Sequence, residues 1–529
     1  MGTFDDLFRR LEHLNDIGAS LSNERDLSRL LEKIVIAAKH ITRADGGTLY
    51  LISPDKRYLH FEIVRTDSLN IAFGGTSGNP VSGKFPDLPL YDEAGRPNNS
   101  MIAAFAALTG ETVNIADAYV ARGFDFSGTR KFDERTGYRS QSFLTVPMRD
   151  HEGETIGILQ LINATMPTHN VVVPFSEADQ RLAESLASQA AIALTNRALV
   201  RQLEQLFESF IHLINLAIDE KSPYTGEHCQ RVPELTMMLA EAAHETTEGP
   251  LADFCLTDKD RYELRIAALL HDCGKVTTPV HIVDKATKLQ TIFDRIELID
   301  TRFELVLRDA EIAMWKHIAA GKPEIEAREA FDEFAAKIKV DRDKLHQANM
   351  GCERMSDEHI EEVKAISRRY RWKTSFGVEM DFLSDDELEN LTIRSGTLTP
   401  KEREIINYHV SATIKMLEAL PWPKHLKNVP EYAGGHHERM DGKGYPRGLK
   451  REDMSWQARM MGIADIFEAL TAGDRPYKQA MSMSEALAIL AKFRDNGHID
   501  PDLHDVFIRS GVYRKFAEAF LGEPRHDDC

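Results

Sequence analysis

The sequence predicts an α+β domain followed by an all-α domain. A chain of 529 residues is long enough for two or more domains. Short apolar or alternating runs, which are typical of strands, occur only in the first third of the chain. From about residue 210 onward, apolar residues recur almost entirely at helical spacing. The two parts therefore have different folds.

The first domain begins with helices and continues with strands. Apolar residues spaced three and four apart run from Phe4 to Leu21, and a second amphipathic stretch covers residues 27–41. Five short runs then predict strands of one mixed, mainly antiparallel sheet. These runs are residues 46–53, 58–64, 111–117, 142–148 and 155–164. Segment 1–175 is thus predicted to pack helices on a sheet.

A long helix is predicted to follow the last strand. Ser176 with Asp179 three residues later predicts a capping box at its start. A heptad seam then runs along it. The seam residues are Ile192, Asn196, Leu199, Leu203, Leu206, Phe210 and Leu213. The seam packs either on its own domain or against a second copy, and the similar stripe in the first helix favours a parallel homodimer.

Composition excludes several classes of function. A formal net charge of −19 argues against DNA binding, although a local basic pocket could still hold a small anion. No apolar run is long enough to cross a membrane, and the first ten residues lack the pattern of a signal peptide. The five cysteines are scattered and form no C-x-x-C pair. We therefore expect a cytoplasmic protein without a membrane or nucleic-acid partner.

The second domain is predicted to be helical throughout. A charged, helix-prone stretch at 291–394 interrupts it, and we interpret this stretch as an insertion of helices with solvated faces. It carries His317, His346 and His359, but no two of them are spaced as ligands on one helical face.

Seven residues of the second domain are candidate metal ligands. They are His228, His271, Asp272, His409, His436, His437 and Asp465. A single histidine on an apolar face is more often a core residue than a ligand. Five such histidines and two such aspartates in one domain favour a metal site.

The chemistry of these residues fits two adjacent divalent ions. Imidazole and carboxylate suit Mn, Fe or Zn, and the lack of paired cysteines argues against a closed structural zinc site. His271 can give a nitrogen to one ion while the carboxylate of Asp272 bridges to a second. Two ions roughly 3.5–4 Å apart can clamp a phosphoryl group and generate hydroxide at neutral pH.

Basic residues near these candidates predict a phosphate-binding pocket. Lys275 lies one helical turn after His271 and Asp272 and would neutralise phosphate charge. Arg475 offers a bidentate fork, and Lys478 adds a point charge at helical spacing from it. The pocket would be basic within an acidic protein.

Three motifs give the second domain a resemblance to a known family. They are "HDCGK" at 271–275, "HHERMDGKGYP" at 436–446 and "ADIFEALTAGDRPYK" at 464–478. Together they resemble the HD-GYP subgroup of HD phosphohydrolases, which is named in part for the triplet found here at 444–446. The resemblance implies hydrolysis of cyclic di-GMP to pGpG and often to GMP, with two bound ions, Fe or Mn.

The resemblance also implies roles for individual residues. One ion would be held by His228, His271, Asp272 and Asp465. The second ion would be held by Asp272, which bridges the two, and by His409, His436 and His437. Asp272 and Lys275 would act in catalysis, and Lys275, Tyr445, Arg475 and Lys478 would contact the substrate.

The chain departs from this family's pattern at three places. Tyr224 stands where some members have a glutamate for a third ion, so we expect two ions. "DKATKL" at 284–289 replaces a Lys-Pro-Gly-Lys-Leu loop, and the insertion at 291–394 follows before the next family helix. Substrate access and preference are therefore open.

The first domain resembles a GAF domain, a module for small ligands and dimerisation. The resembling stretches are residues 14–38, 44–53 and 142–164. The signature of cyclic-nucleotide-binding GAF domains is incomplete here, because the lysine expected after Asn163 and the final acid are missing. We therefore expect an unidentified small ligand. The predicted ranges are 1–198 for this domain, 199–216 for a helical linker and 217–529 for the HD-GYP domain.

Two other functions remain open from the sequence. The second domain could hydrolyse a different nucleotide, such as a mixed cyclic dinucleotide, because nothing in the sequence separates guanine readers from adenine readers. It could also sense cyclic di-GMP without hydrolysing it and signal to a partner. The presence of all seven candidate ligands and of Lys275 favours an enzyme.

Overall fold

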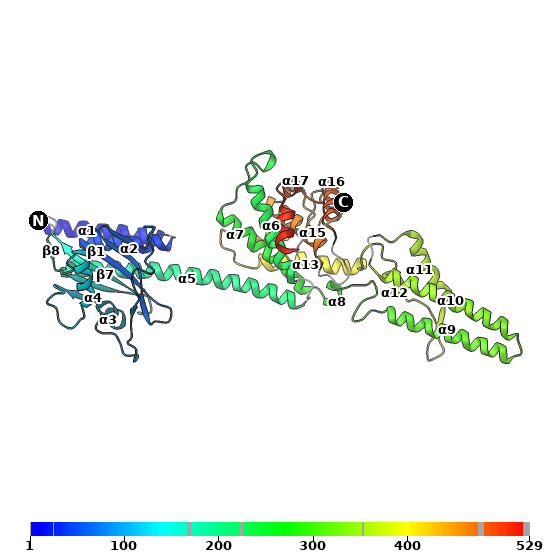
Figure 1. Cartoon of the computed structure of the whole chain (residues 1–529). Coiled ribbons are helices and arrows are strands. Elements are labelled where there is room, and N and C mark those ends of the chain that lie inside the picture. The colour runs from blue at the N-terminus through cyan, green and yellow to red at the C-terminus, as the bar shows by residue number, and fades with distance from the viewer. Residues whose placement is uncertain are drawn as a thin grey trace. The chain divides into compact units, whose positions relative to one another are not determined.

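The computed structural model describes residues 2–24, 26–166, 171–221, 226–351, 354–473 and 481–521. It divides into two compact units, Met1–Phe207 and Glu208–Cys529 (Figure 1). No described helix combines the length and the apolar character needed to span a membrane.

The N-terminal unit is built on one antiparallel sheet. Its strands are β1 (Ala44–Ile52), β2 (Tyr58–Thr66), β3 (Ile71–Phe73), β4 (Leu88–Pro89), β5 (Val113–Ile115), β6 (Phe143–Arg149), β7 (Thr155–Thr165) and β8 (Val172–Val173). The main order is β3-β2-β1-β7-β6-β5, and every described pairing is antiparallel, so the sheet is not mixed. All five predicted strands are present. The three additional strands are only two or three residues long.

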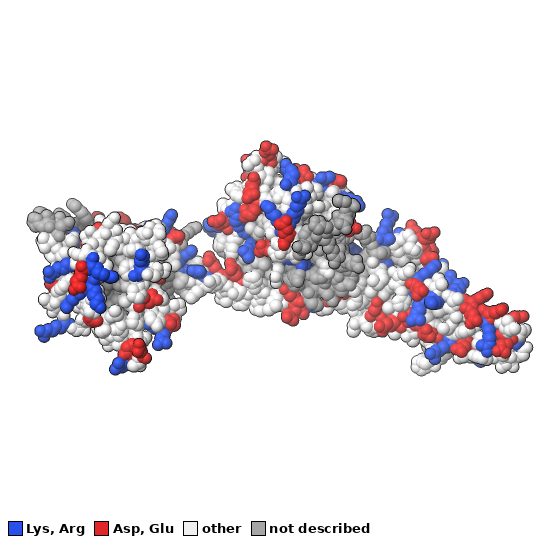
Figure 2. Space-filling view, viewed as in Figure 1, with Lys and Arg blue, Asp and Glu red and all other residues white. Residues whose placement is uncertain are grey.

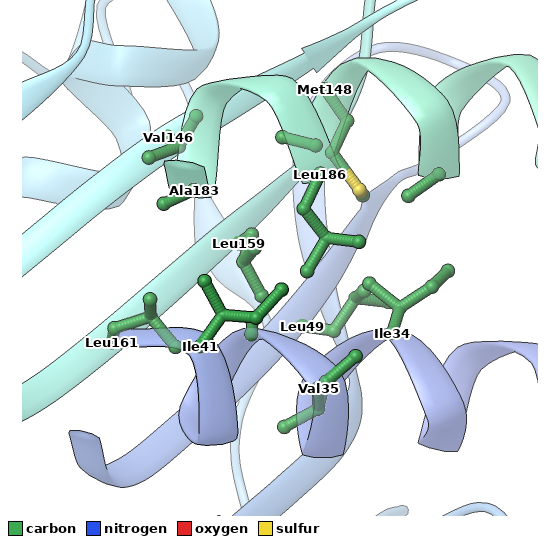
Figure 3. Packing of buried hydrophobic residues seen from close by; sticks show 14 of the residues in the cluster. Ile34, Val35, Ile41, Leu49, Val146, Met148, Leu159, Leu161, Ala183 and Leu186 are labelled. Atoms are coloured by element: carbon green, nitrogen blue, oxygen red, sulfur yellow. The ribbon is translucent and has the colours of Figure 1, made fainter. Parts of the chain in front are cut away.

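The helices of this unit cover the sheet on both faces. They are α1 (Gly2–Asn23), α2 (Leu27–Thr42), α3 (Ile102–Thr109), α4 (Ser127–Thr136) and the start of α5 (Glu177–Lys221). Leu159 of β7 lies opposite Leu49 and Val146 in the ladder. Ile34 of α2 and Leu186 of α5 pack with these three leucine and valine side chains in one apolar core (Figure 3). A second apolar cluster, which includes Ile102, lies around α3.

Helix α5 contributes buried residues to each unit. The predicted capping box is present, because Ser176 Oγ accepts from Asp179 N at 3.2 Å and Asp179 Oδ2 accepts from Ser176 N at 2.9 Å. In the second unit, Ile211 and Ile218 of the same helix are buried. The six apolar residues of the seam, from Ile192 to Leu213, are 49–67% exposed, so the seam does not pack on the described residues of its own chain.

The second unit is mainly helical. Its HD-like part contains α6 (Gly226–His244), η1 (Gly249–Leu251), α7 (Asp258–Leu270), η2 (Cys273–Thr277), α8 (Val280–Val283), α13 (Pro400–Glu418), α14 (Val429–Gly434), η3 (Arg451–Asp453), α15 (Trp456–Thr471), α16 (Met483–Asp495), α17 (Pro501–Arg509) and α18 (Val512–Phe520). Several of these helices begin with capping boxes, such as that of Thr399 and Glu402 at α13.

The insertion is a folded element with its own core. It contains α9 (Ile296–Ala319), α10 (Glu324–Asn349), α11 (Asp357–Arg369), β9 (Arg371–Lys373), β10 (Glu379–Asp381) and α12 (Asp385–Leu391). Phe303, Leu345, Val363 and Phe382 belong to an apolar cluster inside it. The small β9–β10 hairpin was not predicted. Acidic and basic side chains intermix over the visible face of α9 and α10, as the solvated faces of the prediction require (Figure 2).

Two buried lysines fix the ends of the insertion. Lys285 Nζ donates to Asn390 Oδ1 at 2.8 Å and to the carboxylate of Glu402 at 2.7 Å. Lys288 Nζ donates to the carbonyl oxygens of Leu391 at 3.3 Å and Ile393 at 2.9 Å. Both lysines belong to the "DKATKL" loop, so this loop joins the two ends of the insertion.

Candidate metal centre

Glycines allow the elements that carry the candidate ligands to approach one another. His271 caps the C-terminus of α7 and Asp272 directly precedes η2. A Cβ on Gly274 would lie 2.0 Å from the carbonyl oxygen of His409, so only glycine lets this turn contact α13. Gly274 N also donates to Thr413 Oγ1 at 2.9 Å. This contact sets His271 and Asp272 beside His409.

A second close contact places α15 beside the paired histidines. A Cβ on Gly462 would lie 3.0 Å from the carbonyl oxygen of His436. His436 follows Gly435, the C-cap of α14, and Asp465 lies on α15 one turn after Gly462. Because Gly462 has no side chain, α15 can lie close to His436, and Asp465 on the same helix then belongs to the same centre.

The loop at 438–449 is folded around a buried carboxylate. Glu438 accepts hydrogen bonds from Arg447 N at 2.7 Å and Leu449 N at 2.9 Å. A Cβ on Gly444 would lie 2.4 Å from Arg439 N, which explains the glycine. The Tyr445 ring stacks on the ring of His437, with a centroid distance of 4.9 Å and an angle of 20° between the ring planes. Tyr445 therefore forms a wall of the centre.

Asp272 lies between the histidines. Its Oδ2 is 3.3 Å from His228 Nε2 and 3.2 Å from His271 Nε2. Its Oδ1 is 3.3 Å from His409 Nε2 and 4.0 Å from His436 Nε2. Each carboxylate oxygen thus faces a different pair of histidines.

The candidate ligands form two groups that share this aspartate. His228, His271 and Asp272 form the first group, and His409, His436 and His437 form the second, with ligand atoms within 4.8 Å of one another in each. Asp465 adds to the first group, because its Oδ1 is 3.3 Å from His228 Nε2 and 4.0 Å from His271 Nε2. All seven predicted ligands are therefore close together.

Hydrogen bonds orient three of the histidine rings. The Nδ1 atoms of His271, His409 and His436 lie 2.5–2.7 Å from the carbonyl oxygens of the residues three positions earlier. A carbonyl only accepts, so each Nδ1 must be the donor in these contacts. Nε2 of each ring is then the nitrogen that can bind a metal, and an acceptor behind Nδ1 is the usual partner of a metal-binding histidine.

The buried polar atoms of the centre fit a metal ion. Within the described residues, no hydrogen-bond partner is present for the Nε2 atoms of His228, His271, His409 and His436 or for Oδ1 of Asp272. Burying polar groups without partners is costly. Nitrogen and carboxylate donors without thiolates suit Mn, Fe or Zn. A pair of divalent ions would therefore satisfy these atoms.

Burial and neighbouring charges shift the pKa values of several candidate ligands. Burial lowers the pKa of His437 to about 4 and the pKa of His436 well below its usual value, so both are neutral. Burial also opposes the charge on His228, but Asp272, Asp465 and Glu468 outweigh it and raise its pKa to about 10. A metal ion at Nε2 would displace that proton.

Lys275 lies directly at the centre. Its Nζ donates to Asp272 Oδ2, and the side chain is largely buried. Burial disfavours its charge, but the charges of Asp272 and Asp465 outweigh this effect and raise the pKa of Lys275, so it is a cation. The other two predicted phosphate-binding residues, Arg475 and Lys478, lie outside the described residues, as does Tyr224.

The sequence interpretation missed two residues behind the centre. Glu468 is buried on α15 and contacts His228 Nδ1, and Arg231 is buried on α6 and contacts Glu468. Glu468 follows Asp465 by three residues, and Arg231 follows His228 by three. This helical spacing from a predicted ligand is the signal that could have identified them.

Comparisons with known families confirm the two domains. Residues 26–194 match the GAF domain, residues 225–346 match one description of the HD domain, and residues 384–503 match a second. The fold class predicted from the sequence, an α+β GAF domain followed by a helical HD region, is thus confirmed.

Curated relatives match short parts of the chain. A 3'3'-cGAMP-specific phosphodiesterase of Vibrio cholerae is 44% identical over 82 residues, which are 16% of this chain and 19% of the relative. A cyclic di-GMP phosphodiesterase of Pseudomonas aeruginosa is 36% identical over 121 residues, 23% of this chain and 28% of the relative. The chain thus spans less than a third of the length of either relative.

Among solved structures, the GAF domain of a phosphoenolpyruvate-protein phosphotransferase from Coxiella burnetii is similar to part of the chain. It is 15% identical and covers 37% of this chain and 98% of its own, with a TM-score of 0.28.

Proposed function

The chain carries a GAF domain followed by an HD domain, and from this premise we propose a metal-dependent phosphodiesterase that hydrolyses cyclic di-GMP to pGpG or GMP. The observation that carries the proposal is the arrangement of two histidine groups around one aspartate, Asp272. Such a pair of sites on a shared carboxylate is suited to phosphodiester hydrolysis.

Each group of ligands is proposed to hold one ion, Fe or Mn. His228, His271, Asp272 and Asp465 would hold the first, and Asp272, His409, His436 and His437 the second. When bound, the two ions would lower the pKa of water and neutralise charge on the phosphoryl group. The protein supplies the preset geometry, since backbone carbonyls fix three of the rings.

Lys275 and Tyr445 are the described residues that we propose to contact the substrate. The ammonium of Lys275 contacts Asp272, so it is within reach of a phosphate bound at the shared carboxylate. The Tyr445 ring covers His437 and offers an apolar face beside it. Arg475 and Lys478 are proposed to add phosphate contacts, as their motif implies.

A mixed cyclic dinucleotide is the second candidate substrate. It is favoured by one observation, the 44% identity to a relative that is named as specific for 3'3'-cGAMP. Both candidates share the phosphodiester chemistry and differ in one base. The proposed metal centre does not distinguish them, because its chemistry acts on the phosphodiester group that both candidates share.

A substrate panel tests the proposal directly. The full chain, loaded with Mn²⁺ or Fe²⁺, is incubated with cyclic di-GMP, 3'3'-cGAMP and cyclic di-AMP, and the products are separated by chromatography. We expect pGpG or GMP from cyclic di-GMP at the highest rate. Faster turnover of 3'3'-cGAMP would select the second candidate, and binding without turnover would favour a sensor.

We also propose that the GAF domain regulates the centre through α5. Leu182, Leu186 and Leu194 of this helix belong to the core of the first unit, whereas Ile211 and Ile218 are buried in the second. At its end, Lys221 Nζ donates to the carbonyl oxygen of Lys275 at 3.2 Å. A shift of α5 caused by a small ligand of the GAF domain would therefore reach the turn that carries Lys275.

The exposed seam of α5 supports a homodimer. Its apolar residues follow the four–three spacing of a two-stranded coil and are not covered by described residues of the chain. Leu203→Asp with Leu206→Asp should give monomers in light scattering, whereas Arg197→Asp with Arg201→Asp, outside the seam, should not. An unchanged mass for the first pair would contradict the coil.

The described cysteines Cys229, Cys255 and Cys273 are free, which supports a cytoplasmic location.

A further inference from the structure

One candidate ligand is oriented differently from the others. The Nδ1 atoms of His271, His409 and His436 contact backbone carbonyls, whereas the Nδ1 atom of His228 contacts the carboxylate of Glu468. The two ion sites therefore differ in what lies behind their histidines, because His228 belongs to the first group only.

A side chain from a different helix holds the ring of His228. The rings of His271, His409 and His436 each use the carbonyl of the residue three positions earlier in the chain. At His228 the carboxylate of Glu468, on α15, lies at Nδ1 instead.

Both oxygens of Glu468 are used, and its side chain is 1% exposed. Oε2 contacts His228 Nδ1, and Oε1 accepts from Arg231 Nε at 2.8 Å and contacts Nη2 at 2.7 Å. Arg231 lies one turn after His228 on α6, so the same helix supplies the ring and the cation. The forked guanidinium thus fixes the carboxylate in one orientation.

Glu468 does not belong to the ligand set itself. Its carboxylate lies at Nδ1 of His228, whereas Nε2 of the same ring faces Asp272 and Asp465. The two nitrogens are on opposite sides of the imidazole, so Glu468 lies behind the ring. Asp465, one turn earlier on α15, faces the centre.

We infer that Glu468, fixed by Arg231, is a positioning residue that makes the first ion site bind its metal more tightly than the second. The inference rests on the proposed metal centre and goes beyond it by ranking the two sites. An anionic acceptor behind an imidazole holds the ring in place and increases electron density at the opposite nitrogen. Loss of such a partner typically costs about 10–100-fold in metal affinity.

The test measures metal affinity without substrate. Metal-free full-length chain is titrated with Mn²⁺ alone in a calorimeter, and the wild type should show a tight and a weaker event. Glu468→Gln should weaken the tight event about 10–100-fold and leave the other unchanged. To assign the event, the same substitution is made in His409→Ala, which keeps only the first group intact. The remaining event should weaken by the same factor.

A buried glutamate elsewhere in the second unit provides the control. Glu263 is 4% exposed and accepts from Asn428 N at 2.7 Å, but it does not contact a candidate ligand. Glu263→Gln should bind Mn²⁺ as the wild type does. Saturating Mn²⁺ should restore hydrolysis by Glu468→Gln, which a misfolded centre would not allow. If Glu468→Gln does not fold, Arg231→Gln keeps the carboxylate, removes its anchor and should weaken the same event.

Three results would overturn the inference. Wild-type affinity of Glu468→Gln for both ions would show that the carboxylate has no effect on the site. Equal weakening of both events would show a general structural role. A wild-type chain that binds no Mn²⁺ would contradict the proposed metal centre itself, which separates that failure from the first two.

Discussion

The apolar core of the N-terminal unit and the metal centre of the second unit are equally buried but chemically opposite. In the first, residues such as Leu49, Leu159 and Leu186 fill the space between sheet and helices and need no partner other than one another. In the second, four histidine nitrogens and an aspartate oxygen are buried without hydrogen-bond partners among the described residues. Apolar burial explains why the first region is stable, whereas the second is arranged for binding.

The difference extends to the role of glycine. At Gly274, any side chain would collide with the backbone of α13. In the apolar core, by contrast, packing tolerates small changes in volume at a graded cost. The comparison therefore predicts that substitutions at the metal centre abolish its activity, whereas substitutions in the apolar core lower the stability of the fold by graded amounts.

The largest effect is expected for Gly274→Ala. The added methyl group would lie 2.0 Å from the His409 carbonyl, so the turn that carries Asp272 must move away from α13. A displacement of about 1 Å can cost about 100-fold in rate, and we expect at least this loss in cyclic dinucleotide hydrolysis. Gly128→Ala is the control, because nothing lies within 4 Å of the added atom there. Near-normal turnover by Gly274→Ala would contradict the described contact.

An intermediate effect is expected for Leu159→Ala in the apolar core. Leu159 is fully buried at the centre of the sheet, and removing such a side chain costs about 2–5 kcal/mol of unfolding free energy. In denaturant unfolding of the full chain, the transition of the first unit should shift while Mn²⁺ binding stays unchanged. Val120→Ala, at a 76% exposed position, should shift neither. Loss of Mn²⁺ binding in Leu159→Ala would show that the two regions are not independent.

The smallest effect is expected at the ion pair of Glu32 on α2 with Arg65 on β2. Burial opposes the charge of Glu32, but hydrogen bonds from Arg65 and Thr76 outweigh it and lower its pKa to about 2. The folded-state pKa is below the usual value of 4.5, so the stabilisation is present above pH 4.5 and is lost as the pH falls toward 2. Glu32→Gln should cost about 1.5 kcal/mol at neutral pH, because it removes hydrogen bonds to a charged group.

The pH dependence of unfolding checks this prediction. The difference between wild type and Glu32→Gln should shrink between pH 4.5 and pH 3. Glu111→Gln, at an exposed position, should show no comparable difference. A difference that stayed constant down to pH 3 would show that the charge of Glu32 is not involved.

Much of the fold could be predicted because local pattern and packing agree. The five predicted apolar or alternating runs became strands and the Ser176–Asp179 pair became a cap, since each depends on neighbouring residues alone. Strands β3, β4 and β8 are too short to show alternation. The core of the insertion was not predicted, because apolar residues such as Phe303 and Phe382 are interspersed among many charged residues in this stretch.

The metal centre was also predictable only in part. The seven candidate ligands were found because their motifs carry them, and the structure brings them around Asp272. The partners behind them were not found, since backbone carbonyls leave no trace in the sequence and Glu468 resembles any helical glutamate. Only the fold shows that Glu468 reaches from α15 to α6.

The most direct test of the two-ion centre is to measure Mn²⁺ content and cyclic di-GMP hydrolysis together in wild type and Asp272→Ala. Among the residues that the structure describes, Asp272 is the one that faces both histidine groups through separate oxygens. We predict two ions per chain and turnover for the wild type, and loss of both metal binding and turnover for the folded variant. Full activity of Asp272→Ala would contradict the account.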